Sequence, residues 1–309
     1  MGVPGGLLPL KSHRPFIQLL VALLVILVIS SLVLLLSMLT GRIIFGPSVS
    51  EIDLSSEMLA PSQSSYLKFI QTMSQVSIFL LPGLVISWFM TGNIKGWLGL
   101  NKTVHPVMIA MVILLALACI PLTSLTGLIN SEMEFPGWLH FVEKWMQAKE
   151  EEAQLLTSHL VYASGTWGML LNLFILAIVP AAGEEILFRG VIQQMMQKWL
   201  NSGIIAVVLT AVLFSTLHFQ FYGFLPRMIL GIVFGLLFLW SKSLWLPFIA
   251  HMVNNSIPVV LSYFSGWDNI NENAVDYIPA GFAPIIVMIV LPSALLYVIR
   301  DYYRQGAWF

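Results

Sequence analysis

Long apolar runs dominate this chain and limit what it can fold into. Of its 309 residues, 58% are hydrophobic and 9% are charged, and the mean hydropathy is +0.88. A soluble domain carries roughly a quarter charged residues, whereas a run of about 20 apolar residues can cross the hydrocarbon core of a bilayer as a helix. The composition therefore predicts an all-α, polytopic bundle of membrane helices.

Eight such runs alternate with more polar segments. We expect membrane helices at about 16–39, 69–90, 105–129, 166–183, 203–219, 228–241, 244–264 and 281–299. The sixth run is short for a span, but Gly231 and Gly235 within it fit the small-xxx-small pattern of closely packed helices. With eight spans, both termini lie on the same side, which also holds nine of the 14 Lys and Arg residues. The positive-inside rule then places both termini in the cytoplasm.

The chain is expected to form one membrane domain in three parts. Residues 1–165 hold three spans and a polar outer loop, 166–264 hold the residues of chemical interest, and 265–309 hold the last span and a tail. In the loop, apolar residues recur at helical spacing from Trp138 to Met146. This pattern predicts an amphipathic helix on the outer membrane surface or a solvated linker helix. The sequence contains no stripe of basic residues of the kind that would indicate a nucleic-acid partner.

Two adjacent glutamates, Glu184 and Glu185, interrupt the fourth apolar region just after Pro180 and Gly183, which weaken the helix. Ionisable groups at bilayer depth are costly and by default functional. Adjacent residues on a helix project about 100° apart, so the two carboxylates are expected to differ in role. Arg189 lies four residues after Glu185 and can pair with it, which leaves Glu184 as a general base. The alternative is a pair of acids at the membrane interface.

Three further polar residues lie in later apolar runs. His218 ends the fifth run, and His251 and Asn255 share one face of the seventh helix because four residues separate them. Each alone could be an interfacial residue or a helix–helix contact. Together with Glu184 they supply the parts of a hydrolytic site, namely a base, a histidine that shares its water, and donors for an oxyanion.

Three short motifs contain these residues: Glu-Glu-x-x-x-Arg at 184–189, Phe-x-x-x-His at 214–218 and His-x-x-x-Asn at 251–255. In this order they resemble the CPBP family of intramembrane proteases, which includes the type II CAAX prenyl endopeptidases and the bacterial Abi proteins. Residues 166–264 would then be a CPBP-like catalytic core, whereas no family motif is found before them.

The resemblance implies a role for each matched residue. Glu184 and His218 would activate water, His251 and Asn255 would bind the oxyanion, and Arg189 would hold Glu185. The family also implies an integral protein of the bacterial inner membrane that cleaves a membrane-associated protein or peptide. A prenylated substrate is one alternative.

The residues leave the metal requirement and two other functions open. Glu184, His218 and His251 offer the two-histidine, one-carboxylate donor set of a zinc site. Against zinc, the sequence lacks His-Glu-x-x-His, and Asn255 is a poor zinc ligand. We predict a metal-free hydrolase without a cofactor, with zinc as the alternative. A non-catalytic bacteriocin-immunity or scaffold protein is a second hypothesis. A proton-coupled transporter is a third, although no internal repeat supports it.

Overall fold

The computed structural model describes residues 10, 13–56, 58–133, 135–267 and 282–306, and all regular elements within these ranges are helical. Six helices are long and apolar enough to span a membrane: Pro15–Phe45, Pro61–Thr91, Pro106–Ser131, Gly165–Leu200, Phe221–Ser241 and Pro284–Arg304. The protein is therefore an integral membrane protein, and the predicted all-α, polytopic bundle is confirmed. The chain ends and residues 268–281, part of the predicted C-terminal unit 265–309, lie outside the described residues.

Each of the eight predicted runs corresponds to a helix, but two of these helices differ from a typical span. Helix α10 (Gly203–Thr216) has only 14 residues. Helix α12 (Trp245–Ser265) is not among the six candidate spans, and it carries His251 and Asn255. The predicted eight spans thus correspond to eight helical segments, of which six have the length and apolarity of a span within the described residues.

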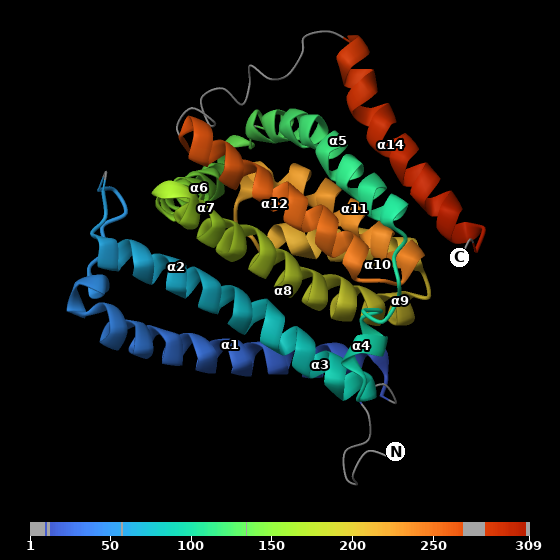
Figure 1. Ribbon diagram of the computed structural model, residues 1–309, viewed down its shortest axis with the longest axis horizontal. Helices are drawn as coiled ribbons and strands as arrows, with labels where there is room; N and C mark the ends of the chain where they lie inside the picture. The colour runs from blue at the N-terminus through green and yellow to red at the C-terminus, as the bar shows by residue number, and fades with distance from the viewer. Residues whose placement is uncertain (1–9, 11–12, 57, 134, 268–281, 307–309) are drawn as a thin grey trace.

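The helices that carry the candidate residues lie in the middle of the bundle (Figure 1). On one side, α1 (Pro15–Phe45) packs against the helix formed by α2 (Pro61–Gln75), the π-helical turn η3 (Val76–Leu80) and α3 (Leu81–Thr91). On the other side, α5 (Pro106–Ser131) packs against α14 (Phe282–Arg304). Most apolar side chains of α1 are exposed, as expected for a helix in contact with lipid tails.

The longest helix holds both glutamates in its interior. It comprises α7 (Gly165–Leu173), the π-helical segment η5 (Phe174–Ile178), α8 (Val179–Leu187), a second π-helical segment η6 (Phe188–Gln193) and α9 (Gln194–Leu200). The helix does not end near residue 183, where the predicted span ends, but continues to Leu200. Pro180 lacks the N–H that an α-helix would use there, and the wider π turn before it allows the helix to continue. Glu184 therefore lies near the middle of a 36-residue helix.

Glycines allow the central helices to approach closely. A Cβ atom on Gly183 would lie 3.2 Å from Phe79 Cβ, so α8 and the α2–α3 helix are in direct contact. A Cβ atom on Gly231 of α11 (Phe224–Ser241) would lie 3.0 Å from Ala211 Cβ of α10. This contact agrees with the close packing that the small-xxx-small pattern predicted.

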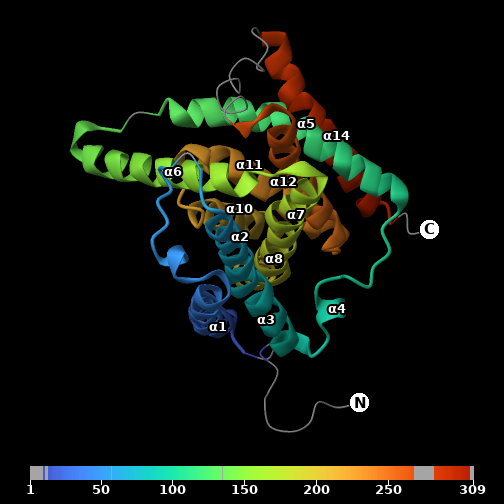
Figure 2. The same ribbon diagram turned by 60° about the vertical axis from the view of Figure 1, so that its left-hand side comes forward.

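The polar loop between α5 and α7 contains helix α6 (His140–Val161), which extends along one side of the bundle (Figure 2). Trp138 lies just before the start of this helix and is 76% exposed, and Phe141, its second residue, is 72% exposed. Trp145 contacts Phe221 at a ring-centroid distance of 5.3 Å. The helix predicted from the spacing is thus present, with exposed aromatic residues near its N-terminus.

Candidate active site

Three helices bring Glu184, His218 and His251 together. Glu184 projects from α8, His218 follows the end of α10, and His251 projects from α12. Glu184 Oε2 lies 3.9 Å from His218 Nε2 and 3.7 Å from His251 Nε2. Residues up to 67 positions apart in the chain therefore present one carboxylate and two imidazoles to a single point.

The Glu184 carboxylate is buried, and its Oε2 atom has no hydrogen-bond partner among the described residues. The separations from the two Nε2 atoms exceed those of a direct hydrogen bond and are those that a bridging water would span. Burying a carboxylate oxygen without a donor is costly. Glu184 Oε2 is therefore a buried acceptor that receives no hydrogen bond from the described residues.

His218 is oriented by the backbone of the helix that precedes it. Its Nδ1 lies 2.7 Å from the Phe214 carbonyl oxygen, to which Nδ1–H donates. In the neutral ring this assignment leaves the lone pair on Nε2, the atom that faces Glu184. The Phe214 ring packs edge-on against the imidazole at 4.7 Å. His218 is 26% exposed, so this face of the site can be reached from outside the protein.

Glu185 contacts two cationic or ionisable side chains at once. Its Oε1 lies 2.9 Å from Arg189 Nη1 and 2.8 Å from His251 Nδ1, and all three side chains are buried. Arg189 Nη2 also donates to the Gly231 carbonyl oxygen at 3.1 Å. The spacing of four residues indicated the contact with Arg189, but no sequence pattern indicated that with His251. His251 therefore approaches both carboxylates, although the glutamates project in different directions.

Aromatic rings enclose the Arg189 guanidinium. Its central carbon lies 4.9 Å from the Phe214 ring, 5.6 Å from Phe234 and 6.0 Å from Phe188, distances that permit cation–π attraction. Phe234 also stacks on the His251 ring at 5.0 Å. Sequence reasoning did not single out Phe234. Its only signal was its position inside the Gly231–Gly235 segment.

Asn255 is the one predicted site residue that neither a hydrogen bond nor an ion pair within 4 Å joins to the others among the described residues. It lies one turn after His251 on α12 and is half-buried. Its side chain makes no hydrogen bond to any residue that the structure describes, so its amide donors are not used by those residues. Its role in binding an oxyanion stays a prediction.

The zinc alternative depends on how the side chains of Glu184, His218 and His251 are arranged. Among the described residues, no group of three or more His, Cys, Asp or Glu side chains is placed so as to hold a metal ion. Glu184, His218 and His251 face one another without forming such a group. The metal requirement therefore stays a prediction.

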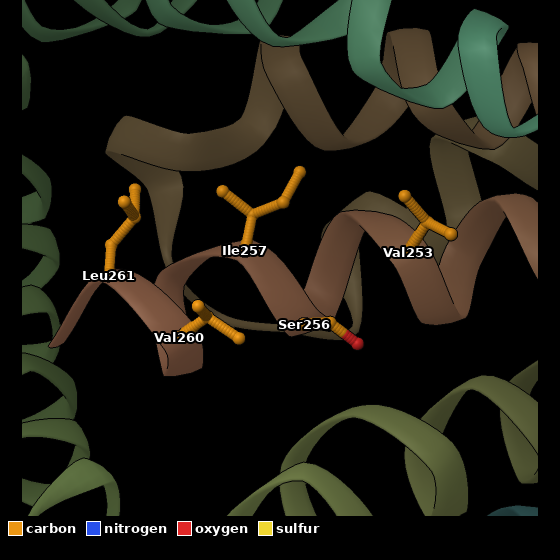
Figure 3. A pocket seen from close by; sticks show the side chains of 5 residues that line it. All are labelled: Val253, Ser256, Ile257, Val260 and Leu261. Carbon is orange, nitrogen blue, oxygen red and sulfur yellow. The ribbon is translucent and has the colours of Figure 1, made fainter. Parts of the chain in front are cut away.

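A cavity of about 320 Å³ lies beside α12 but does not belong to this site (Figure 3). Its lining residues are Val253, Ser256, Ile257, Val260 and Leu261. At about 100° per residue, these positions lie on the side of the helix opposite His251 and Asn255. The Ser256 hydroxyl donates to the Met252 carbonyl oxygen at 2.7 Å, which leaves an essentially apolar cavity.

The fold and the site define a class of protein, an integral membrane protein with a buried glutamate–histidine site among its helices. Residues 166–257 match the family described as Type II CAAX prenyl endopeptidase Rce1-like. This segment contains every predicted site residue, so the resemblance to the CPBP and CAAX protease family that the motifs predicted is confirmed over residues 166–257.

The chain is also similar to a protein of Bacillus subtilis (strain 168). Over 90 residues the chain is 27% identical to "Uncharacterized protein YpbD" of Bacillus subtilis (strain 168), a stretch that covers 28% of this chain and 43% of that protein. The chain thus matches less than half the length of this relative. No solved structure matches the chain.

Proposed function

We propose that the protein is an intramembrane endopeptidase that hydrolyses a peptide bond of a membrane-associated protein or peptide. The observation that carries this proposal is Glu184 Oε2, a buried acceptor without a partner among the described residues and within 4 Å of two imidazole nitrogens. The family match is the second support, since its description names a peptidase.

In the proposed reaction, Glu184 and His218 activate one water molecule. Glu184 accepts a proton from the water as its oxygen attacks the carbonyl carbon of the scissile peptide bond. His218 Nε2 accepts a hydrogen bond from the same water and keeps it aligned. Collapse of the tetrahedral intermediate breaks the C–N bond, and the proton held by Glu184 passes to the leaving amine. The products are a carboxylic acid and an amine, so atoms and charge balance.

The negative charge that develops on the carbonyl oxygen is assigned to His251 and Asn255. Asn255 would donate from its amide, and His251 would donate from Nε2 in its imidazolium form. Glu185 accepts from Nδ1 at 2.8 Å and would stabilise that form. Donors fixed in a water-poor site stabilise an oxyanion strongly. Arg189 would hold Glu185 in place and take no direct part in the reaction.

The proposed substrate is a polypeptide presented from the lipid bilayer, because the site lies within a bundle of membrane helices. A prenyl group on the substrate is one alternative, and the name of the matched family supports it. We further propose that the protein resides in a bacterial inner membrane with both termini in the cytoplasm, as the distribution of Lys and Arg predicts.

Cleavage of a defined reporter tests this function. Purified protein in liposomes is incubated with a farnesylated peptide that ends in a CAAX sequence and with a peptide anchored by an apolar helix, and products are identified by mass spectrometry. Wild-type protein should cleave one of them, and Glu184→Gln should be slower by roughly 10²–10⁴-fold. The control is Glu152→Gln, the same change at an exposed residue of α6, which should retain full activity. Lack of cleavage by the wild-type protein would count against the proposal.

The metal-free mechanism needs its own test. Protein that contains less than 0.1 zinc per chain after chelation, on the order of background, should retain its full rate if Glu184 and His218 activate water directly. Loss of the rate on chelation and its return with added zinc, at about one ion per chain, would instead support the zinc alternative.

A further inference from the structure

The turn that carries His218 has an unusual backbone. It joins α10 to α11 through the short 3₁₀ helix η7 (Phe221–Gly223). Phe219, directly after His218, has a φ of 54°, in the left-handed region that bulky residues rarely adopt. A residue held there costs about 1–3 kcal/mol and persists only where the surrounding structure imposes it. Other contacts must therefore hold this turn.

Asn130, at the end of α5, holds the turn from outside the core that carries the family motifs. Its Nδ2 donates to the Phe221 carbonyl oxygen at 2.8 Å, and its Oδ1 accepts from the Leu225 N–H at 2.8 Å. The side chain is 7% exposed. A buried amide that uses both its donor and its acceptor on one short segment fixes the position of that segment in two directions.

Two residues of the core hold the same turn from other sides. Arg227 donates from Nη1 to the Gln220 carbonyl oxygen and from Nη2 to Gln220 Oε1, both at 2.6 Å. Its guanidinium lies against Gly223, where an added Cβ atom would be 2.5 Å from Nη2. The Ser215 hydroxyl donates to the Phe224 carbonyl oxygen at 2.6 Å. The turn is thus held by side chains from α5, α10 and α11.

We propose that Asn130 is a positioning residue for His218. By fixing the turn against α5, it keeps His218 Nε2 directed at Glu184 Oε2, 3.9 Å away. The inference rests on the proposed function, because it assigns Asn130 an effect on the rate of that reaction. It also means that residues 166–257, which match the family, do not assemble the site alone. A displacement of about 1 Å at a catalytic group can cost roughly 10²-fold in rate.

The test compares two identical substitutions. Asn130→Asp removes the donor to Phe221 and keeps the acceptor for Leu225. Asn172→Asp is the matched control, because Asn172 is also buried and donates through Nδ2 to a backbone carbonyl, that of Val161 at 2.7 Å. Asn130→Asp should lower kcat on the reporter peptide at least tenfold and leave KM within twofold. Both variants should lower the thermal midpoint to a similar extent. Asn172→Asp, however, should leave kcat within threefold.

A milder variant keeps the inference testable if Asn130→Asp does not fold. Asn130→Ser removes both hydrogen bonds of the amide without burying a charge and should lower kcat at least tenfold with KM within twofold. Equal kcat values for wild-type protein and a folded Asn130→Asp or Asn130→Ser variant would overturn the inference and leave the proposed function intact. Absence of cleavage by the wild-type protein would overturn the proposed function and this inference with it.

Discussion

The buried pair formed by Arg189 and Glu185 makes a strong prediction about stability. Both side chains are fully buried, and Arg189 Nη1 lies 2.9 Å from Glu185 Oε1. At an effective dielectric constant of about 20, two unit charges at this distance attract by about 6 kcal/mol. Arg189→Met removes the charge and leaves Glu185 with His251 as its remaining partner. Loss of one member of a buried pair typically costs about 3–5 kcal/mol, and we expect a destabilisation in that range.

Unfolding in mixed micelles of dodecyl maltoside and sodium dodecyl sulfate measures this loss as a shift in the transition. The control is Arg42→Met at an exposed position near the end of α1, which should stay within about 0.5 kcal/mol of wild type. A double variant, Arg189→Met with Glu185→Gln, should recover part of the stability because neither charge is then left alone. Normal stability of Arg189→Met together with loss of activity would refute the reasoning and place Arg189 in the chemistry.

Three further predictions concern packing, the oxyanion and the topology. Gly231→Ala places a methyl group 3.0 Å from Ala211 Cβ and should cost about 1–3 kcal/mol in the same unfolding assay, whereas Gly137→Ala, with no atom within 4 Å of the added carbon, should be neutral. Asn255→Ala should lower kcat by roughly 10²–10³-fold and leave measurable turnover; an unchanged kcat would remove Asn255 from the oxyanion site. In intact cells Ser202→Cys should be labelled only by membrane-permeant reagents, and labelling by an impermeant reagent would invert the predicted topology.

The positions of the helices could be predicted from the sequence because each apolar run is bounded by more polar residues. The end of the helix that contains the fourth apolar run could not be predicted. Pro180 and Gly183 weaken an α-helix locally, and nothing in the sequence indicates that a π-helical turn at Phe174–Ile178 lets the helix continue. The consequence is large, since Glu184 lies inside the helix and not at its end.

The site could be predicted only where spacing along one helix decides the contact. Glu185 and Arg189 are such a pair, four residues apart on one helix. The contact of Glu185 with His251 joins α8 to α12, and that of Asn130 with the turn after His218 joins α5 to α11. Both depend on how separate helices pack, which periodicity does not encode. Phe234 was missed for the same reason, because an aromatic residue in an apolar helix gives no signal of its neighbours.

The central claim is that the two adjacent glutamates have different roles, and one comparison tests it most directly. Glu184 Oε2 makes no hydrogen bond with the described residues, so Glu184→Gln should leave the unfolding transition unchanged and lower the single-turnover cleavage rate by roughly 10²–10⁴-fold. Glu185 Oε1 contacts both Arg189 and His251, so Glu185→Gln should lower the stability by about 3–5 kcal/mol. Each rate is measured on the reporter peptide and corrected for the fraction of folded protein. A Glu184→Gln variant that cleaves at the wild-type rate, or that is destabilised as much as Glu185→Gln, would contradict the account.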